Sequence, residues 1–260
     1  MESIAHIDKV RIGRNFSKCA GSYDRYANVQ RLAARRLIGL TPDAGVKNIL
    51  EIGCGTANYT ILVKEKFKKA RIKTIDISEE MVRVARLKAE TSGVEFVIAD
   101  AEEMELPDRF DLITSNASFQ WFEDLGASLR RYNEVLSEGG CIVFSVFGPL
   151  TFRELGKVLK EVTCCGAVID SGNFLDKKEL EALLKRYFMK SMVKELIVKE
   201  MYPSLIDLLN KIKHTGARGS GSGNVFLWKR DMLKRADEIY KAMFGKIEAT
   251  YQLYFCKGFK

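Results

Sequence analysis

Histidine is scarce in this 260-residue sequence, in which His6 and His214 are the only imidazoles. Two histidines separated by most of the chain argue against a Ser-His-Asp or Cys-His hydrolase. The six cysteines contain no C-x-x-C pair, so a zinc site also lacks ligands. We therefore expect reduced thiols, no bound metal, and a reaction that does not need a histidine base.

Long hydrophobic runs are also missing. No apolar stretch approaches the ~18 residues that a membrane span requires, and residues 1–9 lack the apolar core of a secretory signal. We expect a cytoplasmic protein that does not bind a membrane. Because 47% of the residues are hydrophobic, a large core is possible, and the length suits one large domain or one domain with an insertion.

Positive charge is in excess, and it is unevenly spread. The net charge is +8, and the segment from Lys177 to Arg235 alone carries 14 Lys and Arg against 6 Asp and Glu, a difference of +8. The rest of the chain is therefore close to neutral. Such a segment is either a solvated helical face or a surface for an acidic partner, a nucleic acid or an anionic surface.

Short apolar runs alternate with amphipathic ones between residues 48 and 146, which predicts βαβ units. The expected strands are residues 48–52, 72–75, 95–98, 112–115 and 141–146. The expected helices between them are residues 59–67, 78–90 and 126–136. Ser78 is expected to cap its helix, and Gly139-Gly140 to close the helix before the fifth strand. The predicted fold class is α/β, with a doubly wound, mostly parallel sheet.

The flanking segments follow other patterns. Residues 1–45 look helical and are expected to form an N-terminal helical lid over a cofactor-binding α/β core at residues 46–150. Residues 151–260 are expected to form substrate-cap helices, a C-terminal helical insertion, together with the last strands of the sheet. The elements predicted there are helices at 151–165, 177–187 and 204–213, and strands at 192–200 and 250–255.

A glycine motif follows the first predicted strand, in the order Glu51-x-Gly53-x-Gly55. Glycines at the carboxyl end of a strand let a ligand lie directly against the backbone. This signal is weak alone, because nicotinamide and flavin domains share it. Asn58 stands where a dinucleotide-binding motif has its third glycine, so a ligand without a pyrophosphate is favoured. S-adenosylmethionine fits that description.

Three further strand ends carry polar side chains, Asp76, Asp100 and Asn116. A carboxylate at the position of Asp76 can accept hydrogen bonds from both hydroxyls of a ribose. Asp100 can accept from an adenine amino group, and Asn116 would lie near the sulfonium. Each of these residues alone could be an ordinary turn or cap residue. Their occurrence at consecutive strand ends favours one shared cofactor site.

These motifs, in this order, resemble those of the class I methyltransferases. The resemblance covers residues 48–146 and implies a Rossmann-like, seven-stranded sheet that binds S-adenosylmethionine. Ile77 and Met81 are then the candidates for packing against adenine. The cofactor-binding residues that the resemblance implies are Glu51, Gly53, Gly55, Asp76, Ile77, Met81, Asp100, Ala101 and Asn116.

The flanking segments resemble a narrower family, the malonyl carrier-protein O-methyltransferases of biotin synthesis. The similar segments span nearly the whole chain and are residues 16–30, 115–121, 144–155, 173–175, 212–217 and 249–254. The resemblance implies methyl transfer to the free carboxylate of a malonyl thioester carried by an acyl-carrier protein. Carrier proteins are acidic, so the basic C-terminal face is expected to dock one, with Lys185, Arg186, Lys190, Lys229 and Arg230 as candidates. We expect the enzyme to be a monomer.

The expected chemistry agrees with the scarcity of histidine. A malonyl carboxylate is already ionised at pH 7, so it needs no general base; the enzyme must orient it and exclude water. A lid rich in aromatic residues, Phe16, Tyr23 and Tyr26, suits that task, and Phe16, Tyr23 and Trp121 are counted among the catalytic candidates. Tyr23 could donate a hydrogen bond to the carboxylate, although it could also be an ordinary half-buried tyrosine. Asn173 stands where relatives often have an arginine. If that arginine grips the substrate in relatives, another cation must replace it here. The alternatives are Arg153, Lys213, Arg218 and Arg14, and Arg153 is counted among the catalytic candidates.

Other functions stay open at this point. The acceptor could be a free carboxylic acid or a quinone, and then free acids should react as well as carrier thioesters. A nucleic-acid methyltransferase is suggested only by the pI of 9.1. Asn116-Ala117-Ser118-Phe119 lacks the Pro-Pro-Tyr or Pro-Pro-Phe character of base-gripping loops, so no nucleic-acid partner is expected. The intact acidic residues argue against a scaffold without catalytic activity.

Overall fold

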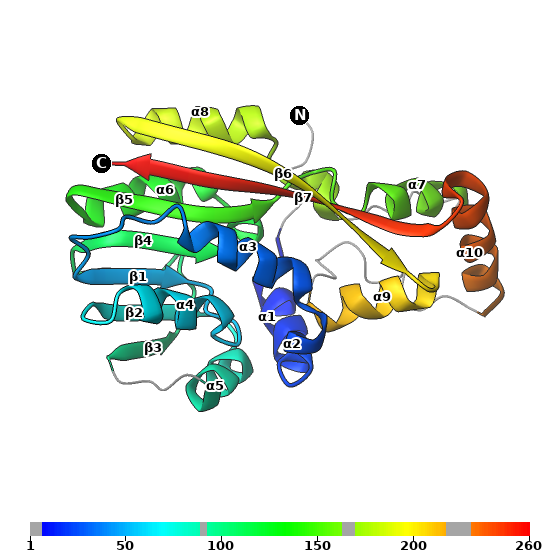
Figure 1. Cartoon of the computed structure of the whole chain (residues 1–260), viewed down its shortest axis with the longest axis horizontal. Helices are drawn as coiled ribbons and strands as arrows, with labels where there is room; N and C mark the ends of the chain where they lie inside the picture. The colour runs from blue at the N-terminus through cyan, green and yellow to red at the C-terminus, as the bar shows by residue number, and fades with distance from the viewer. Residues whose placement is uncertain (1–6, 89–92, 163–169, 217–229) are drawn as a thin grey trace.

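A seven-stranded sheet forms the centre of the computed structural model, which describes residues 7–88, 93–162, 170–216 and 230–260 (Figure 1). In spatial order the strands are β3 (Val94–Ile98), β2 (Arg71–Asp76), β1 (Asn48–Ile52), β4 (Phe110–Asn116), β5 (Leu136–Phe147), β7 (Ile247–Phe259) and β6 (Lys190–Tyr202). Six strands run in one direction, and β7 is antiparallel to both of its neighbours. The expected doubly wound, mostly parallel sheet is confirmed.

Helices cover both faces of this sheet, because its strands are apolar on alternate sides. Ile49 packs into one buried cluster with side chains of α3 (Asn28–Ile38) and α4 (Asn58–Lys66). Its neighbour Leu50 packs into a second cluster with α6 (Leu125–Val135) and α8 (Lys177–Tyr187). Both apolar residues are fully buried, so the parallel strands read as nearly continuous hydrophobic runs.

The N-terminal segment divides into two parts. α1 (Lys9–Cys19) and α2 (Tyr23–Tyr26) lie beside the carboxyl ends of the parallel strands, whereas α3 lies along the sheet (Figure 1). Val29, Ala33 and Leu37 of α3 are buried in the same cluster as the strands, which makes this helix part of the core. Of the described N-terminal helices, α1 and α2 lie at the strand ends and α3 belongs to the core.

The C-terminal segment extends the sheet to one side. β6 and β7 continue beyond the other strands as a long two-stranded ribbon, and α7 (Arg153–Val162), α9 (Leu205–His214) and α10 (Arg230–Phe244) pack near its far part (Figure 1). The 3-10 turn η1 (Phe119–Trp121) lies between β4 and α6, and the turn η2 (Asp170–Asn173) lies between α7 and α8. The helix α10 has no counterpart in the sequence prediction.

Two expectations about helix ends have different outcomes. Ser78 caps α5 (Glu79–Lys88), since its hydroxyl accepts a hydrogen bond from the Met81 N–H at 3.2 Å. The expectation that Gly139-Gly140 closes a helix is wrong, because α6 already ends at Val135 and β5 begins at Leu136. The two glycines lie inside β5, where Gly139 has a positive φ of 72° at an irregular part of the pairing with β4.

Within the described part of the chain, no helix is long and apolar enough to cross a membrane.

Candidate active site

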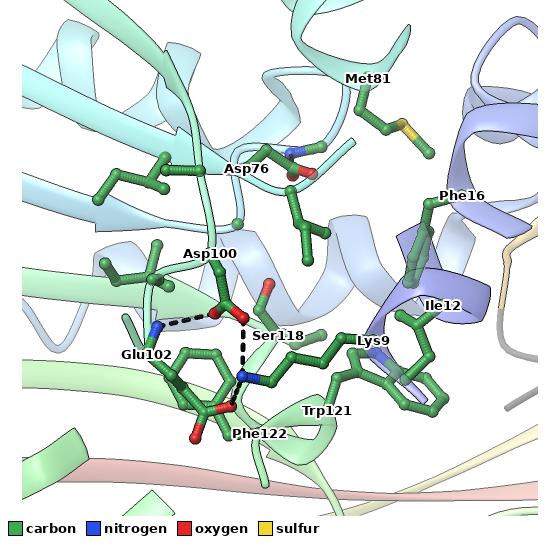
Figure 2. Close-up of a pocket in the computed structure, with 18 of the residues that line it drawn as sticks. Lys9, Ile12, Phe16, Asp76, Met81, Asp100, Glu102, Ser118, Trp121 and Phe122 are labelled. Atoms are coloured by element: carbon green, nitrogen blue, oxygen red, sulfur yellow. Dashed lines mark hydrogen bonds and ion pairs between the residues drawn. The ribbon is translucent and has the colours of Figure 1, made fainter. Parts of the chain in front are cut away.

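A cavity opens at the carboxyl ends of β1, β2 and β4, between the sheet and α1 (Figure 2). Parallel strands point their carboxyl ends at one edge of the sheet, so loop residues distant in sequence converge there. The sheet supplies Gly53, Asp76, Asp100 and Asn116 to the wall of this cavity. We call it the cofactor cavity.

The glycine loop is shaped by close contact with the loop after β4. Gly53 has a φ of +76°, and a Cβ atom on it would lie 1.8 Å from the Ser118 hydroxyl oxygen. Its N–H donates to the Ile75 carbonyl at 2.7 Å, which ties the loop to β2. Only glycine fits this position, because any side chain would displace Ser118 and strain the backbone.

Asp76 is fixed by two backbone donors. Its Oδ2 accepts from the Gly55 N–H at 2.8 Å, and its Oδ1 accepts from the Ser78 N–H at 2.8 Å. Burial raises the pKa of Asp76, and the two backbone hydrogen bonds oppose that shift. Each carboxylate oxygen keeps further acceptor capacity toward the cavity. Asp76 can therefore receive two hydroxyl groups in a fixed orientation.

A salt-bridge cluster closes the cavity near Asp100 (Figure 2). The Lys9 ammonium on α1 lies 2.7 Å from Asp100 Oδ2 and 2.8 Å from Glu102 Oε2, and the Glu102 N–H donates to Asp100 Oδ1 at 2.9 Å. Burial disfavours the charge of Lys9, but the bonds to these carboxylates raise its pKa overall. Lys9, which the sequence analysis missed, thus holds α1 against the sheet.

The face of α1 that meets the cavity contains Lys9, Ile12 and Phe16. Their spacing of three and four residues places them on one side of a helix. The spacing is visible in the sequence and would have identified Lys9 and Ile12 once α1 was known to border the cavity. Figure 2 shows all three side chains extending from α1 toward the strand ends.

A second cavity adjoins the first. Phe16, Tyr23, Ala117 and Trp121 line both. The rings of Phe16 and Trp121 meet edge to face, with centroids 6.2 Å apart, and Phe16 lies 6.5 Å from the Tyr23 ring. Trp121 in turn meets Phe174 at 5.6 Å. We call this aromatic second space the acceptor cavity.

The structure brings most of the predicted site residues together. The cofactor cavity is lined by Phe16, Tyr23, Gly53, Gly55, Asp76, Ile77, Met81, Asp100, Ala101, Asn116 and Trp121. Ser118 and Phe122 also line it and were not predicted. Both follow β4 closely in the sequence, so extending the predicted strand-end motif to residue 122 would have included them.

Glu51 lies away from both cavities. Successive strand residues point to opposite faces, so while Ile52 lines the cofactor cavity, Glu51 points toward α4 and accepts from the Thr60 hydroxyl at 3.0 Å. Its side chain is fully buried, and burial raises the pKa of Glu51 to about 8. Its contact with Thr60 supports the start of the helix that follows the glycine loop.

The predicted cations are also placed away from the acceptor cavity. Arg153, Lys213 and Arg14 are absent from the residues that line either cavity, and Arg218 lies outside the described residues. The Arg153 Nε atom lies 3.1 Å from Glu154 Oε1, and its side chain is 45% exposed. Instead Lys211, on α9, lines the acceptor cavity. It occurs three residues after the buried Leu208, a spacing that indicates the buried face of α9.

Comparison with known proteins places this architecture among methyltransferases. A family model described as a methyltransferase domain matches residues 50–144. The fold is similar to that of the YcgJ protein from Bacillus subtilis, with a TM-score of 0.61 at 16% identity over 88% of this chain and 98% of that one. It is also similar to phosphoethanolamine N-methyltransferase 2 of Haemonchus contortus in complex with S-adenosylmethionine, with a TM-score of 0.58 at 18% identity over 93% of this chain and 57% of that one. These likenesses support the fold.

Closer relatives define the family. Malonyl-(acyl-carrier protein) O-methyltransferase 2 of Ilyobacter polytropus is 34% identical over 95% of this chain and 96% of its own length. The malonyl-(acyl-carrier protein) O-methyltransferase of Acetivibrio thermocellus is 33% identical over 96% of this chain and 93% of its own length. With relatives this similar over nearly its full length, the chain belongs to the malonyl-(acyl-carrier protein) O-methyltransferase family of S-adenosylmethionine-dependent methyltransferases.

Proposed function

We propose that this enzyme transfers a methyl group from S-adenosylmethionine to the free carboxylate of a malonyl thioester on acyl-carrier protein. The product would be the malonyl methyl ester that primes synthesis of the pimeloyl precursor of biotin. The observation that carries the proposal is the pair of adjoining cavities, one with carboxylates for a nucleoside and one aromatic with a cation. The names of the relatives support the choice of acceptor.

The cofactor cavity offers a partner for each part of the cofactor. Asp76 would accept from the two ribose hydroxyls, and Asp100 from the adenine amino group, alongside Lys9. Met81, which is buried, and Ile77 would pack against the adenine ring. Gly53 and Gly55 would let the methionine portion lie against the backbone.

The proposed reaction needs no general base, because the attacking carboxylate is already ionised. When bound, S-adenosylmethionine would supply the methyl group to a carboxylate oxygen, and the electron pair of the broken carbon–sulfur bond would stay on sulfur. Phe16 and Trp121 stand where the two cavities meet, so they would exclude water from the reacting atoms. Tyr23 lines the same junction, and its hydroxyl would donate a hydrogen bond to the carboxylate.

The decisive experiment compares acceptors. The purified enzyme should methylate malonyl-carrier protein with a kcat/KM at least 10-fold above that for malonyl-CoA, and it should leave free malonate nearly unreacted. The reason is that carrier and arm add binding energy that is used to orient the carboxylate. Transfer of a radiolabelled methyl group measures all three rates. Equal activity on free acids would support a small-acid methyltransferase instead.

Replacing Asp76 by alanine should weaken binding of S-adenosylhomocysteine by roughly 30- to 700-fold, or about 2–4 kcal/mol, since two charge-assisted hydrogen bonds are lost. Calorimetric titration measures the effect. Asp111→Ala is the matched control, because Asp111 also accepts from two backbone N–H groups, those of Lys47 and Asn48, but at the other end of the sheet. Unchanged affinity in Asp76→Ala would remove Asp76 from the cofactor site.

Replacing Tyr23 by phenylalanine should lower kcat roughly 10- to 150-fold, because a hydrogen bond to a charged group contributes about 1.5–3 kcal/mol. Raising the pH should not rescue the variant, since no general base is lost. Steady-state kinetics measure this. Tyr26→Phe is the control, because Tyr26 lies on the same helix and stacks on His214 instead. Wild-type turnover in Tyr23→Phe would reduce Tyr23 to a packing residue.

The basic residues differ in their distance from the acceptor cavity, and this difference supports one docking face for the carrier protein over another. Lys190 pairs through Phe259 with Cys141, in the middle of β5, whereas Phe147 at the carboxyl end of β5 lines the acceptor cavity. The six residue steps from Cys141 to Phe147 cover about 20 Å. Arg153 and Lys177 follow Phe152 and Phe174 closely in the chain, and both aromatic residues line the acceptor cavity. A carrier docked on this nearer basic side would have the shorter path to the site.

Charge reversal at two basic sets tests this geometry. Reversing Arg153, Lys177 and Lys178 together should lower kcat/KM for malonyl-carrier protein at least 10-fold and flatten its salt dependence. The rate with malonyl-pantetheine should change little. The comparison set, chosen for its distance, is Lys185, Arg186 and Lys190. A larger loss of kcat/KM from reversal of the comparison set would favour docking of the carrier protein near Lys190. Lys229, another candidate, lies outside the described residues.

A further inference from the structure

A buried lysine is the one charged side chain among the described residues that line the acceptor cavity. Lys211 lies on α9, and its side chain is only 7% exposed. The remaining lining residues are aromatic, small or uncharged polar. Lysine is almost never fully buried unless it is paired, so its position here needs a reason.

Lys211 forms an ion pair with Glu200, and the two residues lie differently with respect to the acceptor cavity. Its ammonium donates to Glu200 Oε2 on β6, and the Tyr202 hydroxyl donates to the same oxygen at 2.5 Å. Tyr202 also shares a hydrogen bond of 2.7 Å with the Tyr251 hydroxyl. Glu200 and Tyr202 are absent from the cavity wall, whereas Lys211 and Tyr251 line it. Of the two charged partners, Lys211 therefore forms part of the cavity wall and Glu200 does not.

The stability that the Lys211–Glu200 ion pair contributes to the fold does not explain why a lysine is buried here. Burial lowers the pKa of Lys211, although the hydrogen bond to Glu200 opposes the shift. Buried ion pairs often contribute no more to stability than well-packed apolar residues do. The ammonium lies 5.6 Å from the centre of the Tyr251 ring, so it sits beside an aromatic wall with little competing water. A negative charge brought into this space would interact strongly with it.

Two side-chain amides in the wall of the same cavity each have an oxygen without a hydrogen-bond donor among the described residues. Gln30 and Gln120 both line it, and each has a buried Oε1 without a hydrogen-bond partner in the described structure. Buried polar atoms are usually satisfied, so an unsatisfied pair around one cavity points to a polar ligand. A carboxylate has no hydrogen to donate to these two acceptor atoms, so the preference for a negative charge in this cavity rests on Lys211.

We infer that Lys211 is the specificity-determining residue that recognises the free carboxylate of the acceptor. The inference rests on the proposed function and extends it to the class of thioesters that end in a carboxylate. Methylation converts the anion into a neutral ester, so the product loses its ion pair with Lys211. The same contact that selects the acid would therefore release the ester and prevent its rebinding.

Binding to enzyme saturated with S-adenosylhomocysteine tests this without turnover. Calorimetry compares malonyl-pantetheine with its methyl ester, two ligands that differ by a charge and one methyl group. The wild type should bind the acid at least 10-fold more tightly than the ester. Lys211→Met should lose that preference, and Lys213→Met should keep it, because Lys213 is an exposed lysine on the same helix that lines neither cavity.

A double variant removes the risk of a misfolded protein. Lys211→Met combined with Glu200→Gln removes the cation without leaving an unpaired carboxylate in a partly buried place. Its affinity for S-adenosylhomocysteine should stay within about 2-fold of the wild type, since neither residue lines the cofactor cavity. Loss of the acid preference in this variant supports the inference, and a retained preference overturns it. Turnover of malonyl-carrier protein by the wild type tests the proposed function separately.

Discussion

The carboxylate of Asp76 joins three parts of the site, since it accepts from the glycine loop and from the start of α5 while facing the cofactor cavity. The glycine loop can take this position beside Asp76 because Gly53 has no side chain that would collide with Ser118. β2 fixes the position of Asp76, and the β1–β2 and β2–β3 pairings fix β2. The geometry at this edge is thus inherited from the register of the parallel sheet rather than from flexible loops.

The acceptor cavity has a different origin, because segments from the whole chain meet around Phe16. This ring contacts Trp121 after β4, and a Cβ atom on Gly216 would lie 2.4 Å from it. Nearby, Tyr26 of α2 stacks on His214 of α9, with ring centroids 4.6 Å apart. The N-terminal helices and α9 therefore support each other, and the cavity between them depends on both.

This difference explains what could be predicted from the sequence. The strands, the glycine loop and Asp76 follow from local patterns, since a strand, a turn and a helix start lie within a few residues of one another. Glu51 was included by motif, but strand alternation turns it to the opposite face. Lys211 was missed because its burial depends on β6 and β7, which meet α9 only in the folded chain. The acceptor cavity is a tertiary feature, and no single segment encodes it.

The shared wall of the two cavities has a kinetic consequence. Phe16 of α1 and Tyr23 of α2 line both spaces, and Lys9 holds α1 to Asp100 and Glu102. In the proposed reaction, a methyl donor that passes α1 would disturb these ion pairs, and the acceptor cavity would be complete only once α1 has returned. Such a wall would favour binding of the methyl donor before the acceptor and release of its demethylated product last.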